Sequence, residues 1–314
     1  MKILITGGAG FIGSNLVEEL LKDERITLVR VLDNLATGHI SNLEEFRTNP
    51  KFEFQHGDIR NLEDCNLACQ RMDAISHQAA LGSVPRSIAD PLTSHNVNVN
   101  GFINVLEAAR TNGIKRIVYA SSSSVYGDLK DSPKVETKVG KVLSPYAATK
   151  MSNELYAEAY ARNYNLTIIG LRYFNVFGPK QYPEGPYAAV IPLFIKAALN
   201  NESPVINGDG TITRDFTPVA NVVQININGL TRELKQGHEV VNVACGKTTS
   251  LNELWKMIKE ITGTIAKATH GPNRKGDIFF SLADISKAKK ILGYKAEIAI
   301  NEGMAETIRW YKPN

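Results

Sequence analysis

The sequence contains few cysteines and no long apolar run. Cys65, Cys69 and Cys245 are the only three among 314 residues, and no two of them form a CxxC pair. This excludes a disulfide scaffold and favours a reduced, cytoplasmic location, with the cysteines as small buried apolar residues. No stretch approaches the roughly 18 apolar residues that a membrane-spanning helix needs. The run Met1–Ile5 is also too short for a signal peptide, so we expect the first strand to begin there.

Basic residues only slightly outnumber acidic residues. Lys and Arg number 36 against 32 Asp and Glu, and the resulting +4 is too small to indicate nucleic-acid binding. The six histidines are scattered without metal-ligand spacing, and no GxSxG motif is present. Neither a metal centre nor a serine hydrolase is therefore expected.

Short β-rich runs alternate with amphipathic stretches over the first 180 residues. The predicted strands are Lys2–Thr6, Ile26–Leu32, Phe52–His56, Ala74–His77, Arg116–Ala120 and Thr167–Leu171. The predicted helices are Phe11–Lys22, Glu63–Arg71, Thr93–Thr111 and Pro145–Asn163. This alternation is typical of a parallel sheet covered on both faces. Right-handed crossovers then predict an α/β fold with a doubly wound Rossmann sheet.

The pattern changes after Asn175. Pro192–Asn200 and Leu251–Thr262 have helical spacing, whereas Glu239–Ala244 is typical of one more strand of the main sheet. We therefore predict two domains. Residues 1–176 and 218–244 form the Rossmann domain, and residues 177–217 and 245–314 form a smaller C-terminal α/β domain.

A glycine-rich loop, TGGAGFIG, joins the first strand to the first helix. Gly7 allows the tight turn, Gly10 lets backbone amides approach a pyrophosphate, and Gly13 lets the helix pack close to the strand. Asp33 ends the second strand 20 residues beyond Gly13, where its carboxylate can hold ribose hydroxyls and repel a 2′-phosphate. The sequence therefore predicts NAD rather than NADP.

Other strand ends are expected beside the same nucleotide, because the carboxyl ends of parallel strands meet at one edge. Asp58 could contact adenine or could serve only as a helix cap. The full set of expected NAD contacts is Gly7, Gly10, Phe11, Ile12, Gly13, Asp33, Asn34, Asp58, Ile59, Ala79, Ala80, Tyr146, Lys150 and Tyr173.

The segment SPYAATK predicts a helix start, with Ser144 as the cap and Pro145 in the first turn. Tyr146 and Lys150 are four residues apart and so project from one helix face. A phenol normally has a pKa near 10, and we expect the neighbouring ammonium to lower it. Such a pair can remove a hydroxyl proton while a hydride leaves the same carbon. Serines 121–124 follow the fifth strand, where their hydroxyls can reach the same cleft.

These motifs, with LRYFNVFG at 171–178, resemble the extended short-chain dehydrogenase/reductase family. The segments QAALGSVPRS, NGDGTITRDF and GDIFFSLADISKA are similar to those of UDP-N-acetylhexosamine 4-epimerases. The resemblance implies tightly held NAD, oxidation at C4 of the sugar, and return of the hydride to the other face. It also implies that Tyr146, Lys150, Ser122 and Ser123 are catalytic.

The resemblance further implies contacts to a UDP-sugar. They are Gly82, Ser83, Ser122, Ser124, Tyr146, Asn175, Arg214, Arg274, Asp277 and Ser281. The two arginines suit phosphate oxygens. Ser281 falls at the position that gates the C2 substituent, where serine leaves room for an N-acetyl group. UDP-GlcNAc and UDP-GalNAc are thus the expected pair, with their uronic acids or UDP-Glc and UDP-Gal as further candidates.

Three other functions are compatible with parts of the sequence. Related 4,6-dehydratases carry an Asp-Glu pair where this chain has Ser123 and Ser124, so dehydration is disfavoured. A UDP-glucuronate decarboxylase remains an alternative, since carboxylate loss from a 4-keto sugar needs little beyond the oxidation itself. A non-catalytic NAD sensor is the other alternative, but such a protein has no need of Tyr146 and Lys150, so their presence argues against it.

In relatives the helices at 93–111 and 145–163 pair across a twofold axis, which implies a homodimer.

Overall fold

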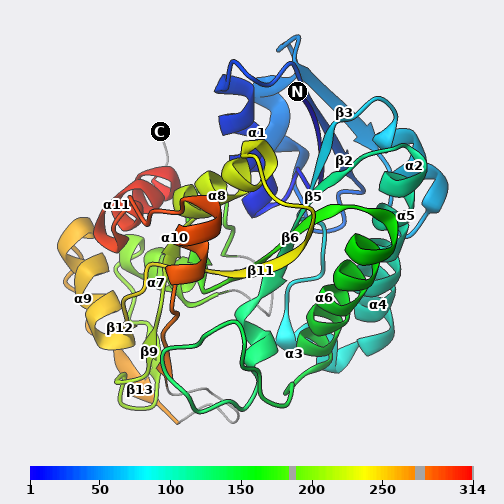
Figure 1. Cartoon of the computed structure of the whole chain (residues 1–314). Helices are drawn as coiled ribbons and strands as arrows, with labels where there is room; N and C mark the ends of the chain where they lie inside the picture. The colour runs from blue at the N-terminus through cyan, green and yellow to red at the C-terminus, as the bar shows by residue number, and fades with distance from the viewer. Residues whose placement is uncertain (184–188, 273–279, 313–314) are drawn as a thin grey trace.

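A parallel sheet lies at the centre of the molecule (Figure 1). The computed structural model describes residues 1–183, 189–272 and 280–312. Within these residues the main sheet has seven strands in the order β11-β6-β5-β4-β1-β2-β3. They are β1 (Lys2–Thr6), β2 (Leu28–Asp33), β3 (Phe52–His56), β4 (Ala74–His77), β5 (Arg116–Ser122), β6 (Thr167–Tyr173) and β11 (Gly237–Val243). Because the chain winds outward from β1 in both directions, the predicted doubly wound α/β fold is confirmed.

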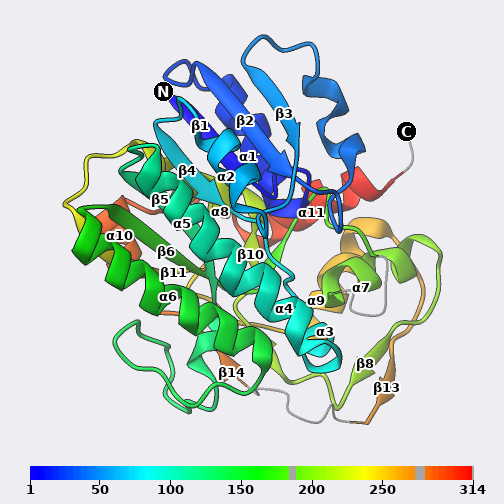
Figure 2. The same cartoon turned by 90° about the vertical axis from the view of Figure 1, so that its right-hand side faces the viewer.

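Helices cover both faces of this sheet (Figures 1 and 2). Successive side chains of a strand point to opposite faces, and in β1 Ile3 and Ile5 join one core while Leu4 joins the other. The first core is closed by α1 (Phe11–Lys22), α8 (Val219–Thr231) and α10 (Ser286–Leu292). The second is closed by α2 (Leu62–Cys69), α5 (Gly101–Thr111) and α6 (Pro145–Tyr164). Cys65 and Cys69 are buried free thiols in the second core, as predicted.

The helix predicted over residues 93–111 is interrupted. The chain instead forms α4 (Pro91–His95), one π-helical turn η2 (Asn96–Asn100) and then α5. Asn98 lies in that turn, fully buried. Its amide accepts from the Leu81 N–H at 2.8 Å and donates to the Thr149 hydroxyl at 3.1 Å. The π turn thus aims a polar side chain at two neighbouring segments, which a regular helix in this register would not do.

A smaller region lies next to the carboxyl ends of the main-sheet strands. Its short strands pair as β7 (Val176–Phe177) with β10 (Thr217–Pro218), β8 (Val205–Asn207) with β13 (Thr269–Gly271), and β9 (Thr213–Arg214) with both β12 (Thr249–Ser250) and β14 (Phe280–Ser281). A third core joins α7 (Val190–Leu199), α9 (Leu251–Thr262) and α11 (Ile300–Tyr311). By contrast, α10 packs on the main sheet beside β11. The division into two domains stays a prediction.

Among the described residues, no helix combines the length and the apolar character that crossing a bilayer requires.

Candidate active site

One cavity of about 1060 Å³ lies at the carboxyl ends of the strands. It brings together segments from β1, β2, β4, β5, β6, α6 and the smaller region. Most of the residues predicted from sequence line it: Gly7, Gly10, Phe11, Ile12, Gly13, Asp33, Asn34, Asp58, Ile59, Ala79, Ala80, Gly82, Ser122, Ser123, Ser124, Tyr146, Lys150, Tyr173, Asn175, Arg214 and Ser281. A cavity of this size at this edge of a doubly wound sheet suits a nucleotide together with a second ligand.

The glycine loop forms one end of the cavity. Gly7 has a φ of +72°, and a Cβ at Gly13 would lie 2.2 Å from the Gly7 carbonyl oxygen. Helix α1 starts at Phe11 with no side-chain cap, so its first amides are available to an anion. These features form a cradle that only glycines permit, and they fit a dinucleotide.

Asp33 fixes the shape of this cradle. One carboxylate oxygen accepts from the Ala9 N–H at 2.9 Å, and the other accepts from the Leu35 N–H at 2.8 Å. Burial raises the pKa of Asp33, against these backbone hydrogen bonds, which lower it. The side chain is 8% exposed and borders the cavity. The predicted role of Asp33 toward the ribose of NAD is compatible with this placement.

Asp58 borders the cavity next to Asn34. The Asn34 amide donates to Asp58 at 2.8 Å, and Arg60 lies 2.6 Å from the same carboxylate. The hydrogen bond from Arg60 holds the pKa of Asp58 at about 2. The alternative interpretation of Asp58 as a helix cap is wrong, since Asn61 caps α2 by accepting from the Glu63 N–H.

Tyr146 and Lys150 project from the start of α6, as predicted. Ser144 caps this helix by accepting from the Ala147 N–H at 3.1 Å, and Pro145 begins it. The Lys150 ammonium donates to the Ala120 carbonyl at 2.8 Å and lies 6.0 Å from the centre of the Tyr146 ring. Helix and strand β5 thereby hold both side chains at the cavity wall.

The predicted lowering of the Tyr146 pKa is wrong. Burial raises the pKa of Tyr146, and only the hydrogen bond with Ser122 lowers it. Burial also lowers the pKa of Lys150 to about 8. A further positive charge in the cavity is therefore needed to favour the phenolate.

The serines at the end of β5 and in the turn after it face different surroundings. The Ser121 hydroxyl donates to Glu154 at 2.6 Å. The Ser122 oxygen accepts from the Ser124 N–H at 3.1 Å and also contacts the Tyr146 hydroxyl. The Ser124 hydroxyl is buried without a hydrogen-bond partner in the described part of the chain. Ser122 and Ser124 can therefore serve a ligand in the cavity.

The other end of the cavity is built by the smaller region. Ser281 in β14 lies beside Arg214 in β9 by strand pairing, although they are 67 positions apart. The Asn175 amide donates to the Asp215 carbonyl at 3.2 Å, and Asn175 has a φ of +37°. This places a hydroxyl, a guanidinium and an amide on the wall opposite the glycine loop.

Three residues predicted to bind substrate are not placed at the cavity. Ser83 caps α3 (Val84–Ala89) by accepting from the Arg86 N–H at 3.2 Å and does not line the cavity. The prediction for Ser83 rested on its position next to Gly82, but its side chain caps α3. Arg274 and Asp277 lie outside the described residues.

Sequence reasoning missed several cavity residues, among them the polar Gln78, Lys134 and Gln181. Gln78 directly follows β4, and that position was a usable signal; its side-chain oxygen accepts from the Tyr173 hydroxyl at 3.1 Å. Lys134 comes from a loop and is 4% exposed, with its ammonium donating to the Leu129 carbonyl. Gln181 comes from the proline-rich segment after β7. Nothing in the local sequence marks Lys134 or Gln181.

The chain is similar to known proteins over nearly its whole length. The family described as GDP-mannose 4,6 dehydratase matches residues 4–307. A UDP-glucose 4-epimerase from Mycolicibacterium smegmatis is 36% identical, and the match covers 99% of both chains.

Two solved structures share the fold closely. A UDP-N-acetylglucosamine 4-epimerase from Methanobrevibacter ruminantium, in complex with UDP-N-acetylmuramic acid, is 37% identical with a TM-score of 0.90, covering 99% of this chain and 97% of that one. A UDP-glucuronic acid 4-epimerase from Bacillus cereus, in complex with UDP-glucuronic acid and NAD, is 31% identical with a TM-score of 0.91, covering 99% and 98%. These relatives share 4-epimerisation and differ in the sugar.

Proposed function

The chain belongs to the extended short-chain dehydrogenase/reductase family of NAD-dependent sugar epimerases and dehydratases, and we propose that this NAD-dependent UDP-sugar 4-epimerase prefers UDP-GlcNAc and UDP-GalNAc. One observation carries the proposal. The glycine cradle, the Tyr146–Lys150 pair and Ser281 all line a single cavity. A dinucleotide and a nucleotide-linked hexose can therefore meet beside Tyr146.

The cradle at Gly7–Gly13 with Asp33 would hold NAD, which supplies reversible two-electron oxidation of a carbinol carbon when it is bound. Tyr146 accepts the O4 proton as C4 becomes a carbonyl, and it returns the proton after the sugar has turned over. Ser122 hydrogen-bonds the Tyr146 hydroxyl and the reacting oxygen. Lys150 holds a positive charge near the phenolate, which stabilises it.

The preference for N-acetylated sugars rests on Ser281. Its side chain is small and lies in the cavity wall beside Arg214. A serine leaves space for an acetamido group at C2, whereas a larger side chain would remove it. The Arg214 guanidinium suits the pyrophosphate of the same substrate.

A second candidate is a uronic acid form of the sugar. Lys134 lines the same cavity and is 4% exposed. Within the described residues its ammonium donates to the Leu129 carbonyl, and the charge of Asp131 raises its pKa against the larger effect of burial. A cation in the cavity wall favours a substrate that brings a carboxylate. UDP-glucuronic acid and UDP-N-acetylhexosaminuronic acids have that group at C6.

A parallel kinetic comparison tests the preference. The NAD-loaded enzyme is given UDP-GlcNAc, UDP-Glc and UDP-GlcA, and kcat/KM is measured for each with Ser281→Tyr and Lys134→Met alongside. The proposal expects UDP-GlcNAc to lead and Ser281→Tyr to reduce that substrate selectively. A lead for UDP-Glc would contradict it. A lead for UDP-GlcA that Lys134→Met removes would favour the second candidate, and a pentose product would indicate decarboxylation.

The proposal includes a homodimer. Helices α3, α4 and α6 lie side by side on one face (Figure 2), and α4 and α6 expose Leu92 at 77% and Leu155 at 66%. An apolar face of this kind suits a second copy of the chain. Sedimentation velocity should give a dimer that Leu92→Glu dissociates. Ile265→Glu, at a residue 81% exposed beyond α9, is the matched control. A monomeric parent protein would contradict this part.

A further inference from the structure

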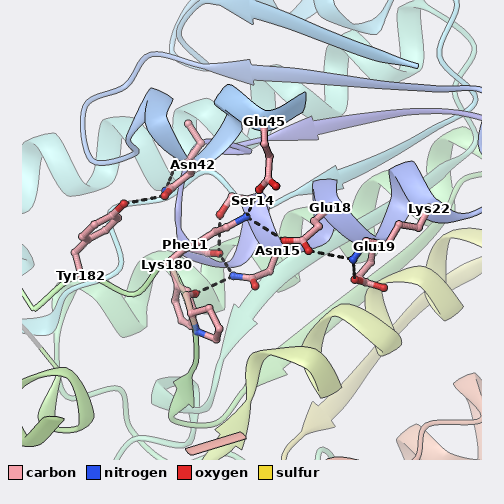
Figure 3. Close-up of polar contacts among 12 residues, drawn as sticks. Phe11, Ser14, Asn15, Glu18, Glu19, Lys22, Asn42, Glu45, Lys180 and Tyr182 are labelled. Carbon is pink, nitrogen blue, oxygen red and sulfur yellow. Dashed lines mark hydrogen bonds and ion pairs between the residues drawn. The ribbon is translucent and has the colours of Figure 1, made fainter. Parts of the chain in front are cut away.

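A short segment that the proposed mechanism does not use packs against the elements beside the glycine loop. It comprises residues 179–182, which we call the strap, and it follows β7. Figure 3 shows the side chains of Lys180 and Tyr182 directed at α1 and at η1 (Ile40–Phe46). Both elements adjoin the predicted dinucleotide site, because α1 begins at the glycine loop and η1 follows the loop after Asp33.

Lys180 anchors the strap by charge. Its ammonium lies 3.1 Å from Glu18 and 3.5 Å from Glu45, and 5.3 Å above the ring of Phe46. The residue is 9% exposed and has a φ of +66°. A non-glycine residue is strained in this conformation, so the surrounding contacts hold it there.

Hydrogen bonds link the strap to the glycine loop through Asn15 and Asn42. The Asn15 amide donates to the Pro179 carbonyl at 3.0 Å and to the Phe11 carbonyl at 2.9 Å. The Tyr182 hydroxyl donates to Asn42 at 2.9 Å, and the Asn42 amide donates to the Ala9 carbonyl at 2.9 Å. The chain of contacts therefore runs from the strap to the backbone that cradles the pyrophosphate.

The other side of the strap is held by α11. The Tyr311 hydroxyl donates to the Gln181 carbonyl, and the rings of Tyr182 and Trp310 meet edge to face at 5.2 Å. Gln181 lines the cavity, and its side-chain oxygen is buried with no partner among the described residues. The strap thus joins the smaller region to the nucleotide end and places an unused acceptor in the cavity wall.

We propose that residues 179–182 retain the dinucleotide: Lys180 and Tyr182 hold the strap against the glycine loop and η1, and NAD leaves only when these anchors break. The proposal rests on NAD as the cofactor and not on the identity of the sugar. It assigns Lys180 and Tyr182 as positioning residues that set the residence time of the cofactor, whereas the glycine loop and Asp33 provide the binding surface.

Isotope exchange of the bound cofactor tests the strap. Protein loaded with NAD is diluted into excess deuterium-labelled NAD without any sugar, and the remaining unlabelled NAD is measured over time by mass spectrometry. Tyr182→Phe removes one hydroxyl and keeps the ring, and Lys180→Met removes the charge and keeps the aliphatic stem. Since one hydrogen bond is worth roughly 1 kcal/mol, each variant should exchange about fivefold faster or more.

Lys22→Met is the matched control. Lys22 also contacts Glu18, at 3.0 Å, but it is 59% exposed and does not touch the strap (Figure 3). Its exchange rate should equal that of the parent protein. Unchanged exchange in both Tyr182→Phe and Lys180→Met would overturn the proposal, and so would equal acceleration in Lys22→Met. Because no sugar is present, either result leaves the epimerase proposal untouched.

Discussion

The buried ion pair beneath the catalytic serines gives the sharpest prediction on stability. Arg172 in β6 binds Glu154 in α6 through two hydrogen bonds of 2.9 and 2.7 Å. The two side chains are only 5% and 8% exposed. Burial lowers the pKa of Arg172, but the hydrogen bonds and charge of Glu154 outweigh it and raise that pKa above its ordinary value. The guanidinium thus stays charged in an apolar environment because of Glu154.

Glu154→Gln removes the negative charge and leaves the guanidinium buried. Losing one partner of such a pair costs about 3–5 kcal/mol, since the remaining charge is uncompensated. The Ser121 hydroxyl also loses a charged acceptor at 2.6 Å. Because Ser121 precedes Ser122, and Ala120 holds Lys150, we expect turnover to fall together with stability.

Urea unfolding at pH 7 with saturating NAD, followed by circular dichroism, measures the free energy of unfolding. Glu44→Gln is the control, because Glu44 pairs with Arg47 at 3.0 Å while both side chains are about half exposed. Exposed pairs contribute about 0–1 kcal/mol. A difference of less than about 1 kcal/mol between the two variants would refute the reasoning.

Three further predictions concern the cavity. Tyr146→Phe should lower kcat about 10²- to 10⁴-fold and leave bound NAD in place; full turnover in this variant would contradict the proton-transfer role. Gly13→Ala should abolish NAD binding in a fluorescence titration, because its Cβ would lie 2.2 Å from the Gly7 oxygen, whereas Gly82→Ala, with nothing within 4 Å, should bind NAD normally. Lys150 has a pKa of about 8, so it is charged below that pH and kcat should decline as the pH rises through 8. A profile that stays flat to pH 10 would exclude its charge from the reaction.

Much of the nucleotide end follows from local sequence. The start of α6 was predictable because Ser144 and Pro145 act within one turn, and the cradle was predictable because glycine spacing is itself local. The interruption before α5 was not, since the bonds of Asn98 to Leu81 and Thr149 exist only after folding. The direction of the Tyr146 pKa shift depends on burial, which no motif encodes.

The residues at the sugar end of the cavity are harder to predict than those at the nucleotide end, because tertiary contacts bring them together. Arg214 and Ser281 become neighbours only through the pairing of β9 with β14. Lys134 reaches the cavity from a loop. That loop is held to the segment after Ser281 by a hydrogen bond in which the Lys134 N–H donates to the Leu282 carbonyl at 2.7 Å. The strap likewise depends on contacts between distant residues, such as hydrogen bonds that span 130 and 164 positions.

Inversion at C4 of a UDP-sugar without net oxidation is the activity proposed for this protein. A proton NMR time course of purified protein with saturating NAD and UDP-GlcNAc measures it directly. We expect UDP-GalNAc signals to grow to a constant ratio while no reduced cofactor accumulates. The absence of any C4 epimer from UDP-GlcNAc, UDP-Glc and UDP-GlcA alike would contradict it.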